Sequence, residues 1–198
     1  MSYTFPLPES PSLQTPKDLY LATYEFLTLY ALPDYPAGNI YRGYQNRAAL
    51  PAGSNEYAIM QITGQYRRGT NVDSYNAQSA TQDEDGTLTT RELVECDMQL
   101  DFYSDGDNAR LRAQTVETLA RSGLASQFFS QSYGIGCLYA GDLRDLSGIT
   151  DADQYVQRFS VTLRLCCWVG VNVKIPWFDA VAVGVKDVDV YYPPIEII

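Results

Sequence analysis

Hydrophobic and polar positions alternate most strictly between Val94 and Phe102 of this 198-residue chain. Apolar side chains occupy every even position of this segment, and polar side chains occupy the odd positions between them. A period of two predicts a half-buried strand, with one face in the core and the other face acidic. The acidic residues of that second face are Glu95, Asp97 and Asp101.

A second alternating segment begins near Tyr155 and continues to about Val173. Its apolar residues first lie on one face only, but from Trp168 to Val171 they occupy both faces, and residues 181–185 repeat this property. We therefore predict a C-terminal β-hairpin that starts near residue 168. A strand pair that is apolar on both faces needs cover on both faces. Because the chain has few helices to supply it, a partner subunit is the simpler source of cover.

Helical spacing of apolar residues is found in two segments. Residues 15–33 begin with a threonine suited to the N-cap and with Pro16 at the first helical position, and they end at prolines. Residues 104–123 begin with aspartates suited to capping and end at a glycine. Residues 124–134 predict one further helical turn, and residues 135–141 predict a brief edge strand.

Together with a β-branched and aromatic strand at residues 56–66, these elements predict an α+β fold, a mostly antiparallel sheet packed with two helices. Residues 1–14 contain three prolines and no periodicity, which predicts an extended arm. Residues 15–198 are then a single domain with a C-terminal hairpin or extension from about residue 168. No apolar run reaches the roughly 18 residues of a membrane helix, and the N-terminus has no signal-peptide pattern. We expect a soluble protein that is not exported.

Composition excludes several classes of function. The net charge of −10 disfavours wrapping of nucleic acid, and the 16 tyrosines favour subunit interfaces. The absence of histidine removes Ser-His-Asp and Cys-His catalysis and histidine metal sites. The four cysteines have no CxxC spacing, so we expect packed, free thiols in a reducing compartment rather than a zinc or redox site. No glycine-rich phosphate motif is present, and no cofactor is expected.

Carboxylates concentrate in the connection that precedes the second alternating strand. Paired carboxylates are the minimum for glycoside or two-metal hydrolysis, so a small acidic enzyme is one hypothesis. The alternative is a turn-rich connection whose acids meet arginines of a neighbouring segment or subunit, and it is favoured because structural ion pairs are the commoner use of such residues. The acids are Asp142, Asp145, Asp151 and Asp153. The acidic run at residues 83–85 is interpreted as a solvated hairpin tip, since it lacks the order of a calcium loop.

The segment YGIGCLYAGDLRDLSGITDADQYVQRFSVTLRL, residues 133–165, combines a glycine-tyrosine stretch, a GDLRDL turn, a spacer and an arginine-bearing alternating strand. With the strand and helix of residues 95–122, it resembles neck or tail-terminator proteins of tailed bacteriophages, over roughly residues 15–170.

The resemblance implies a small α+β protomer that assembles as a ring, typically a hexamer, at the top of the tail tube. Such a ring ends tube growth and joins the tail to the head, in the virion after assembly in the host cytoplasm. Implied partners are further copies of the chain, tail tube and sheath proteins, and head connector or collar proteins, while DNA passes without specific binding. It implies neither an enzyme nor a cofactor. Another neck or collar connector is the alternative within this class.

Candidate site residues follow from these considerations. The acidic strand face of Glu95, Asp97 and Asp101 is predicted to line the channel of the ring, where like charge keeps DNA from sticking. The alternative is an ordinary solvated strand face. Interface residues are expected in the turn, the following strand and the hairpin: Asp142, Arg144, Asp145, Arg158, Trp168, Trp177 and Phe178.

Overall fold

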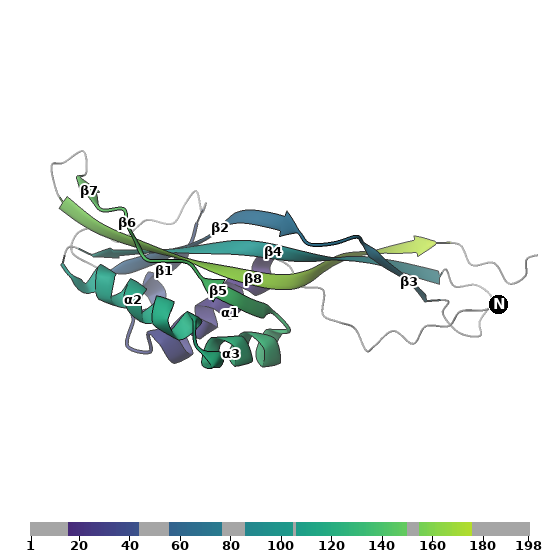
Figure 1. The fold of residues 1–198 in the computed structure, drawn as a ribbon, viewed down its shortest axis with the longest axis horizontal. Coiled ribbons are helices and arrows are strands. Elements are labelled where there is room, and N and C mark those ends of the chain that lie inside the picture. Colours follow the sequence, from purple (N-terminus) through teal and green to yellow (C-terminus); the bar gives the residue numbers. More distant parts are fainter. Residues whose placement is uncertain (1–15, 44–55, 77–85, 105, 150–154, 176–198) are drawn as a thin grey trace, which may run out of the picture.

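The computed structural model describes residues 16–43, 56–76, 86–104, 106–149 and 155–175. Over these residues the chain forms one large sheet with three α-helices on one of its faces (Figure 1). The strand order is β1-β2-β4-β8-β5, with β3 paired to β4 and both β6 and β7 paired to β8. Among the described strand pairs, only β1–β2 is parallel. The predicted α+β class with a mostly antiparallel sheet is confirmed.

The bounds of the elements are as follows. The helices are α1 (Pro16–Phe26), α2 (Asn108–Ala120) and α3 (Gly123–Tyr133). The strands are β1 (Ile40–Arg42), β2 (Tyr57–Arg67), β3 (Val72–Asn76), β4 (Gly86–Ser104), β5 (Gly136–Ala140), β6 (Arg144–Asp145), β7 (Gly148–Ile149) and β8 (Tyr155–Ile175).

Strands β4 and β8 form the centre of the sheet. Their antiparallel register is unbroken from Gly86 opposite Ile175 to Ser104 opposite Gln157. The even-numbered apolar residues of β4 between Val94 and Phe102 are at most 2 % exposed and lie in the core, as the alternation predicts. One face of the sheet therefore lies in the hydrophobic core, and the three helices pack against it from the other side of that core.

The helical layer is larger than the sequence pattern predicts. Helix α1 begins at Pro16 as expected and continues into a π-helical turn, in which Leu32 N–H donates to the carbonyl of Leu27 at 2.7 Å. Residues 123–133 form a full helix, α3, rather than one turn. The stop predicted at Gly123 is wrong, because α2 already ends at Ala120 and Gly123 opens α3. Burial of α3 against the aromatic core, with Phe129 fully buried, supplies the stabilisation that its weak sequence pattern does not.

The start of α2 also differs from the predicted aspartate cap. Asp107 occupies the N-cap position, but its side chain makes no capping hydrogen bond. It accepts from the Gln157 amide at 3.1 Å instead, and the Ser104 hydroxyl accepts from the backbone N–H of Ala109 at 3.0 Å. The cap is thus supplied from the end of β4, which ties the strand directly to the helix.

The cysteines are distributed as the sequence suggests. Cys96, Cys137 and Cys167 are buried, and Cys166 is half-buried. Neighbouring Cys166 and Cys167 lie on opposite faces of β8, because only Cys167 belongs to the apolar core.

Beyond the helices the sheet continues as a three-stranded projection, called here the β-ribbon (Figure 1). It consists of β3, residues 86–93 of β4 and residues 168–175 of β8. The two-sided apolar segment predicted to begin near residue 168 lies in it, whereas the predicted N-terminal arm and the rest of the predicted hairpin, with Trp177 and Phe178, lie outside the described residues.

Candidate functional site: the helix-free face of the sheet

The helix-free face is the side of the sheet opposite the three helices, and the odd-numbered residues of β4 point to it. All three acidic residues predicted on β4 lie here, but their exposed fractions are small: 6 % for Glu95, 9 % for Asp97 and 3 % for Asp101. Each is covered by an arginine with which it forms an ion pair. The face therefore presents paired charges, neither a bare acidic surface nor a solvated one.

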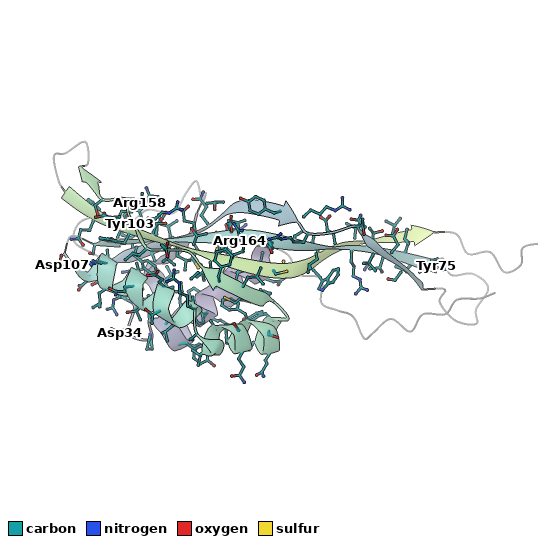
Figure 2. All side chains as sticks on the ribbon, in the orientation of Figure 1. Asp34, Tyr75, Tyr103, Asp107, Arg158 and Arg164 are labelled. Atoms are coloured by element: carbon teal, nitrogen blue, oxygen red, sulfur yellow. The ribbon has the colours of Figure 1, made fainter. Side chains whose placement is uncertain are left out.

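Asp97 and Arg164 form the central pair of this face. The Nε of Arg164 donates to Oδ1 of Asp97 at 2.7 Å, and Nη2 donates to Oδ2 at 3.0 Å. The guanidinium also lies over the rings of Tyr66 and Tyr139, at 5.4 and 5.1 Å from their centroids. A bidentate pair with two ring contacts fixes the guanidinium plane, which gives this part of the face a rigid shape. Figure 2 labels Arg164 at the centre of the sheet.

Glu95 extends the network toward the β-ribbon. Its Oε2 accepts from Nη2 of Arg68 at 2.6 Å and lies 3.9 Å from Nη1 of Arg164. An open pocket of about 340 Å³ forms here, lined by Tyr66, Arg67, Arg68, Glu95 and Arg164. The side chain of Arg68 is about half exposed, so it forms the accessible wall of this pocket.

Asp101 forms the third pair at the opposite end of the sheet. Its Oδ2 accepts from Nη2 of Arg158 at 2.8 Å, and both its oxygens accept from the Gln99 amide at 3.0 Å. Arg158 lies 5.6 Å from the ring centroid of Tyr103, which stacks in parallel on Tyr57 at 4.5 Å. Arg158 and Tyr103 are labelled close together in Figure 2.

The ionisation of these groups follows from the pairing. The hydrogen bond to Asp97 raises the pKa of Arg164, and the hydrogen bond to Glu95 raises that of Arg68. Burial is the largest single influence on Arg158 and disfavours its charged form, but the hydrogen bond to Asp101 and the attraction of Asp101 and the nearby tyrosines together outweigh it, so the pKa of Arg158 is raised. Burial raises the pKa of Tyr103 to about 12. At neutral pH these arginines therefore stay charged and Tyr103 stays neutral, so the ion pairs of the face are preserved.

The predicted turn residues have separate partners. Asp142 accepts from Nη2 of Arg121 at 2.7 Å, which is the intrachain form of the ion pairing expected for this connection. Asp145 accepts from the backbone N–H of Ser147 at 2.9 Å, and the Ser147 hydrogen bonds lower its pKa. Arg144 lies in β6 opposite Ser160. Asp151 and Asp153 lie outside the described residues, and within those residues no group of histidine, cysteine or acidic side chains is arranged to hold a metal ion.

Trp168, also predicted to be an interface residue, stands at the base of the β-ribbon and is 37 % exposed. The guanidinium of Arg91 lies 5.9 Å from its ring centroid. The sequence pattern indicated no role for Tyr66, Tyr139 or Arg68. Alternation along one strand places Arg158 and Arg164 on one face, but it does not reveal which side chains from other strands meet them.

Comparison with known proteins bears on this arrangement. The profile of a family described as phage neck terminator protein matches residues 17–190. The chain belongs to the phage neck terminator family. The resemblance drawn from the sequence is confirmed, and the match includes all the described strands of the β-ribbon. Family membership supports a structural tail-terminator role at the phage neck and lends no support to an enzymatic one.

A solved structure is also similar to this neck terminator. It is the sheath/tube terminator of an extracellular contractile injection system, PVC, in its extended state, with 14 % sequence identity and a TM-score of 0.44. The alignment covers 91 % of this chain and 66 % of that one, so the chain spans just under two thirds of that terminator. The search of curated proteins gave no match. No helix among the described residues is long and apolar enough to span a membrane.

Proposed function

We propose that this neck terminator assembles as a closed homo-oligomeric ring of six copies at the head-tail junction. The ring caps the tail tube, joins the tail to the neck and lets DNA pass through its centre. The observation that carries the proposal is the family match over residues 17–190.

The partners proposed for the ring are the tail tube and sheath on one side and head connector or collar proteins on the other. The named interface residues that are described, from Asp142 to Trp168, are proposed to contact these neighbours. A collar connector is the second candidate within the same class. The enzyme hypothesis has no support in the described part of the turn, because Asp142 and Asp145 are engaged with different partners.

The ring proposal is tested by electron microscopy of negatively stained, purified full-length protein, together with sedimentation velocity. We expect closed rings with six-fold averages. Monodisperse monomers at every protein and salt concentration would overturn the ring. Rings that attach to head connectors but not to tail tubes would favour the collar alternative.

We also propose that the helix-free face lines the channel. In this proposal Glu95, Asp97 and Asp101 neutralise arginines of the face rather than repel DNA directly. Free arginines on a DNA-facing surface would bind phosphate. Here the three carboxylates form ion pairs with Arg68, Arg164 and Arg158, so these arginines are not free to bind phosphate. Neutralised in this way, the face neither attracts nor strongly repels a passing duplex.

The substitution Asp101→Asn tests this role, because it releases the charge of Arg158 while keeping the shape of the side chain. We expect rings of this variant to retain linear duplex DNA at low salt and to release it at high salt. Asp107→Asn is the matched control, since it changes the net charge equally but Asp107 is bonded to Gln157 rather than to an arginine. Equal DNA retention by both variants would refute the channel assignment and leave the ring untouched.

A further inference from the structure

Two strand edges of the β-ribbon pair with no other strand among the described residues. On the outer side of β8, strands β5, β6 and β7 pair with its residues only as far as Cys166. Beyond that point, no strand among the described residues pairs with this side of β8. The outer side of β3 is open in the same sense, because β3 pairs only with β4. An unpaired edge presents a row of backbone donors and acceptors to another strand.

The backbone groups of β8 that face the open edge can be assigned from its paired half. The N–H of Gly141 donates to the carbonyl of Thr162 at 2.7 Å, and that of Leu146 donates to the carbonyl of Arg158 at 2.8 Å. Even-numbered residues of β8 therefore direct their backbone groups outward. Since the register with β4 has no bulge, Gly170 and its even-numbered neighbours do the same in the β-ribbon.

The same reasoning assigns the outer edge of β3. The N–H of Arg68 donates to the carbonyl of Leu93 at 2.9 Å, so odd-numbered residues of β4 direct their backbone groups to the β2 and β3 side. Ser74 lies opposite Thr89 and therefore faces β4. Its neighbours Asp73 and Tyr75 are left with backbone groups that point outward.

The strand directions of the two edges, and the exposed apolar side chains beside one of them, are compatible with pairing between copies. Both β3 and β8 are antiparallel to β4, so they run in the same direction. Copies related by rotation about an axis along the β-ribbon would bring β8 of one copy beside β3 of the next, in parallel. Val171 and Val173, on the side of the ribbon that faces the helix layer, are 62 % and 46 % exposed. Edge pairing would join these apolar strips into one surface around the axis.

We propose that the outer edge of β8 in one copy pairs in parallel with the outer edge of β3 in the next copy. The contact is head-to-tail, so it propagates around an axis and closes a ring, whereas a two-fold dimer would pair β8 with β8 and leave both β3 edges open. This inference rests on the proposed ring and identifies the strands through which it closes.

Proline substitution at an outward-facing residue tests the pairing, because proline removes the edge donor without touching the ladder to β4. We expect Gly170→Pro and Asp73→Pro each to weaken association by roughly tenfold per interface or more, the loss expected when a backbone hydrogen bond is removed and its acceptor is left unpaired. Gly170→Ala and Asp73→Ala are the matched controls, since both keep the N–H. Sedimentation velocity measures assembly, and thermal melting of each variant against its alanine control checks the fold.

Mixing the two proline variants distinguishes head-to-tail from two-fold pairing. In either variant alone every interface contains one altered edge, so at concentrations too low for this weakened contact the variant should be monomeric. An equimolar mixture at the same concentration should form dimers, because one β8 edge and one β3 edge in it are intact. Dimers of Asp73→Pro alone would overturn the proposal in favour of β8–β8 pairing. Proline variants that form rings as readily as the wild type would overturn the edge contact but leave the ring standing. Absence of rings in the wild type itself would instead remove the proposed function.

Hydrogen exchange of the wild-type protein measures the same edge pairing without any substitution, so it can be used even if proline disturbs the fold. On dilution from assembled to dissociated protein, the amides of Gly170 and Asp73 should change from slow to fast exchange. The amide of Val171, which faces β4, should stay protected in both states. Fast exchange of Gly170 and Asp73 in assembled rings would refute the pairing.

Discussion

Arg164 and Asp97 are 67 positions apart in the chain, yet they lie directly opposite each other on β8 and β4 and form a bidentate ion pair. Two tyrosine rings flank the guanidinium. The pair occupies the centre of the helix-free face, so its geometry sets the shape of that face. Its stability can be measured independently of any partner.

Removal of the carboxylate charge at Asp97 should destabilise the protomer. Asp97→Asn leaves the Arg164 guanidinium without its counter-charge, and we expect a loss of about 2 kcal/mol in the free energy of unfolding. Urea denaturation measures it. Asp142→Asn is the control, since its ion pair with Arg121 is solvent-exposed and should contribute less than about 0.5 kcal/mol. Similar losses for the two variants would show that burial adds nothing to the Asp97 pair.

Helix α3 should be essential to the core although the sequence pattern assigns it only one turn. The ring of Phe129 is fully buried and lies 5.2 Å from that of Phe26 on α1. Phe129→Ala should therefore cost about 3–5 kcal/mol of unfolding free energy. Leu111→Ala, at an exposed position of α2, should stay within about 0.5 kcal/mol of the wild type. A small effect at Phe129 would contradict the position of α3.

Two glycines of α3 should respond in opposite ways to alanine. Gly134 ends the helix at φ 63°, a left-handed conformation in which a side chain is strained, so Gly134→Ala should destabilise by about 1 kcal/mol. Gly123 begins the helix with open space around its Cα, and Gly123→Ala should be neutral or stabilising by about 0.5 kcal/mol. Thermal melting of both variants provides the comparison, and equal shifts would contradict the left-handed cap.

Stability should fall at alkaline pH. Burial raises the pKa of Cys137 from 9.0 to about 11 and that of Tyr103 from 10.0 to about 12. Both groups are neutral in the folded protein at pH values where they already lose their protons in the unfolded chain, so the unfolded state binds fewer protons. The stabilisation is complete below about pH 9 and is lost as pH rises through about 11 and 12.

Urea unfolding between pH 8 and 12 measures this loss. In Cys137→Ala the decline between about pH 9 and 11 should be smaller than in the wild type, because the contribution of this buried thiol is absent. An unfolding free energy that is constant over this range would contradict the assignment of both groups.

Local pattern was sufficient for much of the fold. The alternation between Val94 and Phe102 predicted the buried face of β4, and Pro16 predicted the start of α1. Helix α3 was underestimated because burial of Phe128 and Phe129, rather than local spacing, stabilises it. The cap of α2 was misassigned because a serine at the end of β4 competes with the aspartates.

The sequence by itself determined which residues share a face of each strand, because side chains alternate with a fixed period of two wherever a strand forms. It thereby placed Glu95, Asp97 and Asp101 together, and Arg158 with Arg164. Only the tertiary structure decided that these acids are buried and paired with Arg68, Arg164 and Arg158, because cross-strand register depends on how segments distant in the chain align. The same register determines which backbone groups of β3 and β8 point away from β4, and it depends on the pairing of distant segments rather than on either segment alone.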